Sequence, residues 1–174
     1  MGAPVRAAVA GTLVLWAALS AVAQESKSAP LAKQLTQALD AAKMTALAAR
    51  DPGQRDGYVA ALYLPPTLLV VAARYSVPVL LDAKIAKKQY QDAYVDLQSA
   101  SVSGSKVFVQ DLNADGLQFG TFDSVDTPKG SITFDGDWKK AKAASEQEYQ
   151  KSFVEADEQY AKMLEVLLAA MKQR

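Results

Sequence analysis

The sequence predicts one α+β domain, built on a mainly antiparallel sheet of about five to six strands that is packed by helices. Short apolar runs separated by turn residues indicate the strands, and apolar residues at helical spacing before, between and after these runs indicate the helices. The chain of 174 residues contains no internal repeat and no linker long enough to divide it into two domains. Half of the residues are hydrophobic, which is a globular composition and not that of a disordered chain.

Residues 1–23 have the pattern of a secretory signal peptide, so we expect the folded domain to comprise residues 24–174. Arg6 supplies a positive charge, residues 7–20 are apolar but too short to span a bilayer comfortably, and residues 21–23 offer small side chains for cleavage. The alternative is an uncleaved membrane anchor. With cleavage, the sequence predicts a secreted or periplasmic protein that is free of the membrane. The absence of cysteine fits a bacterial periplasm better than eukaryotic secretion.

The first helix is expected to begin at Ser28, which can serve as its N-cap, with Pro30 in the first turn. Leu31, Leu35 and Leu39 recur every four residues and give this helix an apolar stripe. The stripe predicts that one side of the helix packs on the sheet.

The segment 44–50 is ambiguous, because it could continue the first helix or form a strand with alternating side chains. Apolar runs on both sides of Pro65 and Pro66 are expected to be buried strands, since this proline pair cannot donate to a ladder and makes a natural corner. Two later runs are expected to form a hairpin around the sequence NADG. The expected strands are 58–64, 67–75, 106–112, 117–122 and 131–138.

Two further helices are expected. The middle one starts at Ser76 and ends before a loop of small residues at 99–105. The C-terminal one is long and amphipathic, and Ser145 with Glu148 forms the S-x-x-E capping box at its start. Its apolar stripe comprises Tyr149, Phe153, Ala156, Tyr160, Met163, Leu164, Leu167, Leu168 and Met171.

Polar side chains on these helices are expected to have ordinary roles. Glu155, Asp157 and Glu158 are expected at the surface, near Lys151 and Lys162 as in common i,i+4 pairs. The tyrosines are expected to be core residues whose hydroxyls reach toward the surface, and they are Tyr90, Tyr94, Tyr149 and Tyr160.

The composition excludes several classes of function. Lys plus Arg and Asp plus Glu number 19 each, so no excess of charge favours nucleic acid as a partner. The chain has neither histidine nor cysteine, which excludes Ser-His-Asp and Cys-His catalysis, zinc sites of the usual kind and disulfides. We therefore expect a small exported binding or interaction protein rather than an enzyme. Its ligand, a protein or a small molecule, is not named by the sequence.

Asp111, Asn113 and Asp115, followed by Gly116, reproduce the first half of an EF-type calcium loop. Calcium prefers oxygen ligands, which are the metal ligands that remain in a chain without histidine and cysteine. An alternative function is therefore a calcium-stabilised module that uses these three side chains, with Asp123 as a further candidate ligand.

The second half of the calcium motif is missing. Phe122 occupies the position of the bidentate glutamate, Asp123 lies one residue later, and the flanking segments are expected to be strands rather than helices. A hairpin turn explains the same residues without an ion, because Asn, Asp and Gly tolerate the positive φ of tight turns. Of the two interpretations, the sequence favours the turn. The acidic turn 135–137 is expected to be a simple loop as well.

A second candidate site would bind an anion. Arg74 and Ser76 lie where a strand is expected to enter a helix, and they could hold a phosphate or carboxylate. The order of elements over residues 44–135 resembles the flavin-binding split barrel of pyridoxamine-phosphate-oxidase-like proteins. The resemblance implies a flavin whose phosphate is held at this corner by basic and hydroxyl residues, and Arg74, Ser76 and Lys84 match these residues in kind. A plain N-cap role for Ser76 is the alternative that the sequence favours.

Overall fold

The computed structural model describes residues 26–55, 57–74 and 106–174 of the chain. The predicted signal peptide and the predicted middle helix, with Tyr90 and Tyr94, lie outside the described residues. The described elements are α1 (Ser28–Ala41), β1 (Ala46–Arg50), β2 (Gly57–Leu64), β3 (Thr67–Arg74), β4 (Lys106–Asp111), β5 (Ser124–Thr127), β6 (Gly130–Thr133) and α4 (Glu146–Lys172).

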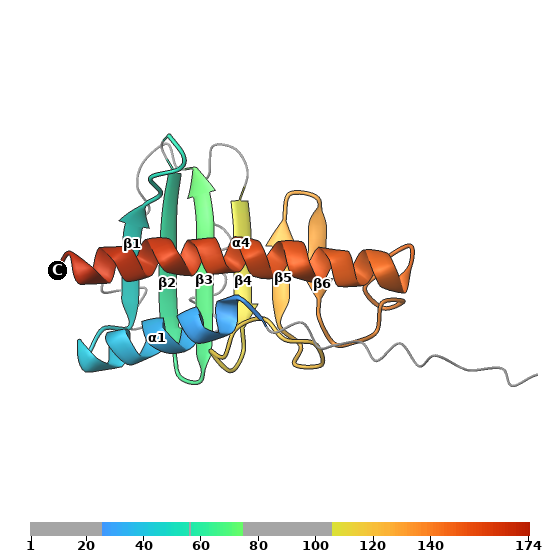
Figure 1. Cartoon of the computed structure of the whole chain (residues 1–174), viewed down its shortest axis with the longest axis horizontal. Helices are drawn as coiled ribbons and strands as arrows, with labels where there is room; N and C mark the ends of the chain where they lie inside the picture. The colour runs from blue at the N-terminus through green and yellow to red at the C-terminus, as the bar shows by residue number, and fades with distance from the viewer. Residues whose placement is uncertain (1–25, 56, 75–105) are drawn as a thin grey trace, which may run out of the picture.

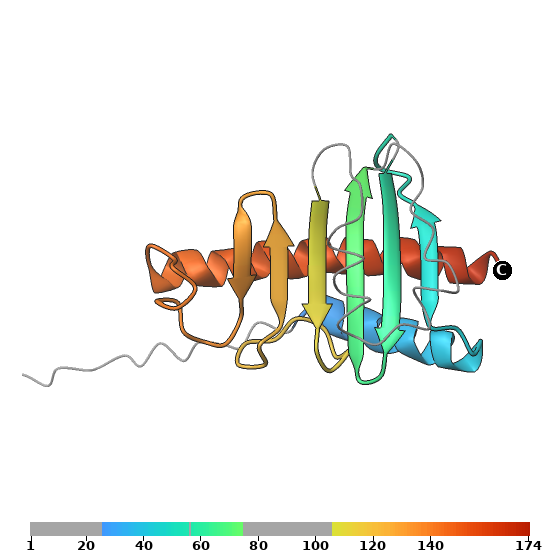
Figure 2. The same ribbon diagram turned by 180° about the vertical axis from the view of Figure 1, so that it is seen from behind.

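The six strands form one antiparallel sheet in the order β1-β2-β3-β4-β5-β6, so each strand pairs with its neighbour in the chain. Helices α1 and α4 contact each other and lie across the same face of this sheet (Figures 1 and 2). The predicted α+β domain, with an antiparallel sheet and a long C-terminal helix, is therefore confirmed.

α1 ends where Lys43 takes a left-handed conformation with φ of 53°, and the chain then turns back into β1. The amide of Met44 donates to the carbonyl oxygen of Leu39 across this turn, at 2.8 Å. All the residues of β1 pair with residues of β2. Most of the ambiguous segment 44–50 is therefore a strand and does not continue the helix.

The hairpin of β2 and β3 matches the expectation from the sequence. Pro65 and Pro66 form its two-residue turn, with a cis peptide bond between them, and Leu64 pairs with Thr67 on either side. Side chains on both faces of these two strands are buried, which is why their sequences are continuously apolar instead of alternating.

The prediction of a strand at 117–122 is wrong. Gly120 and Phe122 have positive φ values of 82° and 62°, which a residue in an extended strand does not adopt. These residues belong to a loop, 112–123, and the strand that pairs with β4 is β5, which begins at Ser124. The connection between β4 and β5 is therefore much longer than a tight NADG turn.

The predicted strand 131–138 is shorter in the structure, because β6 ends at Thr133. The amide of Asp137 donates to Oδ1 of Asp135 at 2.9 Å, which closes an Asx turn. The Nζ atom of Lys140 lies 3.5 Å from Oδ2 of Asp135 and 3.8 Å from Oδ2 of Asp137. This acidic turn is thus a loop with its own positive counter-ion.

α4 begins at the predicted capping box. The hydroxyl oxygen of Ser145 accepts a hydrogen bond from the amide of Glu148 at 3.1 Å. The carboxylate of Glu148 accepts from the amide of Ala144 at 2.9 Å, one residue before the position that the motif predicts. Most of the predicted apolar stripe is buried with α1 and the sheet in one core, in which each fully buried leucine contributes roughly 1.5–3 kcal/mol.

Candidate metal site

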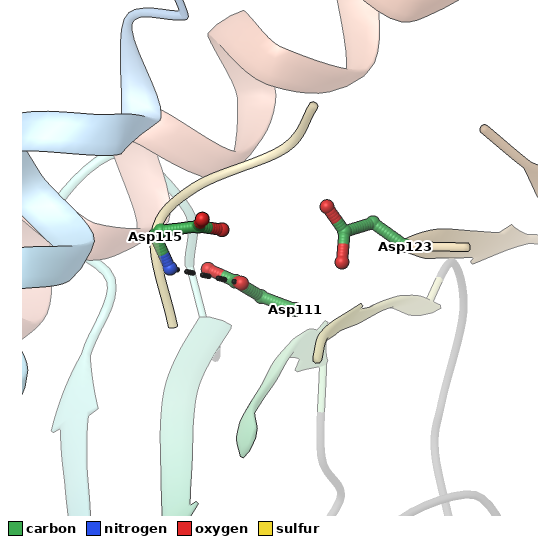
Figure 3. Close-up of side chains that lie close together, drawn as sticks. All are labelled: Asp111, Asp115 and Asp123. Carbon is green, nitrogen blue, oxygen red and sulfur yellow. Dashed lines mark hydrogen bonds between the residues drawn. The ribbon is translucent and has the colours of Figure 1, made fainter. Parts of the chain in front are cut away.

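Three aspartates at the ends of β4 and β5 and in the loop between them point toward one another (Figure 3). Asp111 is the last residue of β4, Asp115 lies in the loop, and Asp123 directly precedes β5. Each offers one carboxylate oxygen, and these oxygens all lie within 4.8 Å of one another. Calcium–oxygen distances of roughly 2.3–2.6 Å allow two ligands of one ion to lie up to about 5 Å apart. A single cation could therefore contact all three carboxylates.

The carboxylate of Asp111 is fully buried and accepts hydrogen bonds from the loop and from α4. Its Oδ1 accepts from the amide of Asp115 at 3.2 Å, and its Oδ2 accepts from the amide of Gly116 at 2.9 Å and from the hydroxyl of Tyr160 at 3.1 Å. Tyr160 is itself completely buried, so the expectation that its hydroxyl reaches toward the surface is wrong. Burial and the neighbouring Asp111 raise the pKa of Tyr160 well above its ordinary value.

The carboxylate of Asp123 is also fully buried and holds the remainder of the loop. Its Oδ1 accepts from the amide of Leu112 at 3.0 Å, and its Oδ2 accepts from the amide of Gln118 at 3.1 Å and from the hydroxyl of Thr121 at 2.6 Å. Side-chain acceptors of this kind compete with strand hydrogen bonding, which explains why the apolar run after Gly116 is not a strand.

The hydrogen bonds leave acceptor capacity within the cluster. Each oxygen of an ionised carboxylate has two lone pairs, and Oδ1 of Asp111 and Oδ1 of Asp123 accept one bond each from the described residues. Oδ1 of Asp115 is buried and has no hydrogen-bond partner among the described residues. A buried carboxylate oxygen without a partner is costly, and the rest of the Asp115 side chain is partly exposed, so a cation or water can supply the missing contact.

The negative charge of the cluster is not balanced by a positive side chain among the described residues. Burial, and next the charge of Asp123, raise the pKa of Asp111 to about 7. Burial is also the main cause that raises the pKa of Asp123. In the part of the chain that the structure describes, no lysine or arginine forms an ion pair with Asp111, Asp115 or Asp123. Either a bound proton or a metal cation can neutralise such a cluster.

The loop also contacts the start of α1. Gly116 has φ of 85° and lies so close to the helix that a Cβ atom there would be 2.4 Å from the backbone nitrogen of Ala29. The amide of Leu117 donates to the hydroxyl oxygen of Ser28 at 2.9 Å. Ser28 was expected to cap α1 from outside, but it is the first residue of the helix, and its hydroxyl binds the loop and Asp157 instead.

The charged residues of α4 differ from the sequence expectation in part. Glu155 pairs with Lys151 at the surface as expected, with 3.8 Å between the charged atoms. Asp157 is buried, so its expected surface pairing is wrong. Glu158 pairs with Lys27 ahead of α1, and this hydrogen bond lowers the pKa of Glu158.

The structure brings together Asp111, Asp115 and Asp123. Asn113, the other residue of the predicted metal set, lies exposed in the same loop, and its role as a ligand stays a prediction. Asp123 lies one residue beyond the last position of the EF-type spacing, where the exposed Phe122 stands. Strands flank the loop on both sides. The site therefore has the first half of an EF-type motif in a different structural setting.

The second candidate set, Arg74, Ser76 and Lys84, stays a prediction. Arg74 is the last residue of β3, where its backbone pairs with that of Gly57, and Ser76 and Lys84 lie outside the described residues. The described strands form a sheet with β1 and β6 at its two edges. Visible absorbance of the purified protein is the check on a bound flavin.

None of the helices in the described ranges is long and apolar enough to cross a membrane. Comparison of the chain with protein-family models, with curated proteins and with solved structures gave no match.

Proposed function

We propose that this protein is a small exported binding or interaction module whose fold is stabilised by calcium, held by Asp111, Asp115 and Asp123. The observation that carries the proposal is the convergence of these carboxylates beside a buried oxygen, Oδ1 of Asp115, that has no hydrogen-bond partner among the described residues. Export rests on the predicted signal peptide, and the binding partner is not identified.

Calcium is the cation that suits these donors best. Carboxylate oxygens favour calcium or magnesium over zinc and copper, and the chain has no histidine or cysteine. Magnesium demands near-ideal octahedral geometry, whereas calcium accepts irregular sets that water or backbone carbonyls complete. A site with three carboxylates and no bidentate glutamate should be weak, with Kd of about 10⁻⁴ to 10⁻³ M, as in extracellular modules.

The role that we propose for the ion is structural. It would join the end of β4, the loop and the start of β5, and it would offset the repulsion between the buried carboxylates of Asp111 and Asp123. We propose no catalytic step, because each of these two carboxylates already accepts three hydrogen bonds that hold the fold.

Thermal unfolding in excess EDTA and then in millimolar calcium tests the proposal. Calcium at about tenfold above Kd should stabilise the folded protein by about 1.4 kcal/mol. For a domain of this size, that gain corresponds to a rise in Tm of roughly 3–6 °C. Asp115→Asn should lose the rise. In EDTA this variant should be at least as stable as the wild type, because it removes one negative charge from the cluster.

Asp135→Asn is the matched control. It removes a carboxylate from the other acidic turn, where Lys140 already supplies a positive charge, so the effect of calcium on Tm should remain. Equal melting temperatures of the wild type in EDTA and in calcium would contradict the proposal. The three carboxylates would then serve only to hold the turn. A rise that persists in Asp115→Asn would assign the ion to another part of the chain.

A further inference from the structure

We infer that the loop 112–123 and the start of α1 form one conformational unit, closed by the buried carboxylate of Asp157 on α4. In this unit the loop keeps its shape only while α1 is docked, so the first residues of α1 control the loop that carries Asp115. The start of α1 lies beside this loop in Figure 1. The inference concerns the protein with or without a bound cation, and it does not rest on the proposed function.

Asp157 attaches the start of α1 to α4. The residue is only 4% exposed, and its Oδ1 accepts from the hydroxyl of Ser26 at 2.8 Å and from the amide and hydroxyl of Ser28 at 3.1 and 2.6 Å. Its Oδ2 accepts from the amide of Lys27 at 2.6 Å. Amides at the start of a helix have no partner within it, and α1 has no capping side chain of its own. Asp157 therefore replaces the N-cap, and its charge complements the positive end of the helix.

Ser28 connects this attachment to the loop. Its buried hydroxyl donates to Asp157 and accepts from the amide of Leu117 at 2.9 Å. A hydroxyl that donates and accepts at once strengthens both bonds, so the loss of one partner weakens the other. If α1 moved away from α4, the amide of Leu117 would lose its acceptor at a buried position, which is unfavourable.

Gly116 makes the second contact between the loop and α1. A Cβ atom at Gly116 would lie 2.4 Å from the nitrogen and 2.5 Å from the Cα of Ala29, so the two backbones touch with no room between them. The amide of Gly116 donates to Oδ2 of Asp111, which also accepts from the hydroxyl of Tyr160. Tyr160 follows Asp157 by about one turn on α4, so one short stretch of α4 holds both sides of the unit.

Amide hydrogen exchange of the full protein in EDTA tests the inference, with the amides of β2 and β3 as the measure of global unfolding. Asp157→Asn keeps the size of the side chain but weakens the acceptor that faces Lys27 and Ser28. We expect the amides of residues 115–117 to exchange at least about tenfold faster in this variant, relative to β2 and β3.

Ser28→Ala separates the two halves of the unit, because the bonds from backbone amides to Asp157 remain. Ser28→Ala should accelerate exchange of the Gly116 and Leu117 amides by a similar factor. The double variant, with Asp157→Asn added to Ser28→Ala, should exchange these amides little faster than Ser28→Ala alone. Thr36→Ala is the matched control. It removes a buried hydroxyl whose hydrogen bonds within the described residues go to carbonyls of α1 itself, so the relative exchange of the loop should not change.

Faster exchange confined to Lys27 and Ser28, with residues 115–117 unchanged in both variants, would overturn the inference. If Asp157→Asn accelerates amide exchange in β2 and β3 to the same extent as in the loop, the variant reports global unfolding. Exchange in Ser28→Ala is then the test of the inference. An unchanged loop in Ser28→Ala would then show that α1 and the loop are independent.

Discussion

Gly116 constrains the path of the loop in addition to the acidic residues around it. Its φ of 85° is unfavourable for any other residue, and a Cβ atom there would collide with the backbone of Ala29. We predict that Gly116→Ala lowers the free energy of unfolding by about 2–4 kcal/mol, since strain and overlap occur together. Urea unfolding monitored by circular dichroism measures this loss.

Gly136 provides the comparison for that substitution. It has a similar φ of 89°, but a Cβ atom there would meet none of the described residues within 4 Å. Gly136→Ala should therefore cost only the backbone strain, about 1 kcal/mol. Equal losses in the two variants would mean that the close approach of the loop to α1 contributes nothing.

Asp111 should make the stability of the cation-free protein fall as the pH rises. Its pKa is about 7 in the folded protein, against about 4 in an unfolded chain. Between these values the folded state binds more protons, so the contribution is complete below about pH 4 and is lost as the pH passes through about 7. The slope is at most about 1.4 kcal/mol per pH unit for one group. The raised pKa of Asp123 acts in the same direction.

Urea unfolding in EDTA between about pH 5 and pH 8 measures this slope. The range lies above the titration of Glu158, whose lowered pKa has the opposite effect in more acidic solution. Saturating calcium should flatten or reverse the slope, because the ion binds ionised carboxylates. Stability that rises with pH in EDTA would contradict the uncompensated burial of Asp111.

The candidate ligands could be predicted from the sequence, but the residues that support them could not. Asp111, Asp115 and Asp123 lie close together in the chain, so their spacing and residue type indicated oxygen chemistry. Tyr160 and Asp157 join the network from α4, far along the sequence. Helical spacing marks one as core and the other as a surface carboxylate, and only the packing of α4 on α1 and β4 reveals their roles.

The start of α4 depends on Ser145. Its hydroxyl oxygen accepts from the amide of Glu148, which has no partner within the helix. We predict that Ser145→Ala lowers the free energy of unfolding by about 1 kcal/mol, measured by urea unfolding.

Ser152 in the same helix is the control for that loss. Its hydroxyl donates back to the carbonyl oxygen of Glu148 at 3.0 Å, so the backbone bond does not depend on it. Ser152→Ala should be neutral or slightly stabilising, because alanine favours the helix interior more than serine. A loss as large as that of Ser145→Ala would contradict the capping role.

Long periodic segments were predicted well, and the short segment at 117–122 was not. The stripe of α4 and the apolar runs of β2 and β3 reflect burial along many residues, which local sequence records directly. LQFGTF alternates like a strand, yet its amides at Gln118 and Gly120 bond to Asp123 and to the carbonyl of Phe134. Asp123 directly follows this segment and Phe134 lies beyond β6, so strand propensity within the segment alone cannot anticipate these acceptors.

The site lies where the sheet, the loop and the helices α1 and α4 meet. Asp111 ends β4, and Asp123 directly precedes β5. α1 contacts the loop through Ser28, and α4 contacts Asp111 through Tyr160. The sequence predicted the fold class because alternating blocks of strand and helix leave few ways to bury their apolar faces. It predicted function mainly by exclusion, and the convergence of the three carboxylates adds the positive argument for a cation.

Calorimetric titration of the EDTA-treated and dialysed protein with calcium measures binding at the three carboxylates. A calcium site there predicts one ion per chain, with Kd of about 10⁻⁴ to 10⁻³ M. It also predicts no binding to Asp115→Asn and unchanged binding to Asp135→Asn. Absence of binding to the wild type up to about ten times that concentration, or equal binding to the wild type and Asp115→Asn, would contradict a calcium site at Asp111, Asp115 and Asp123.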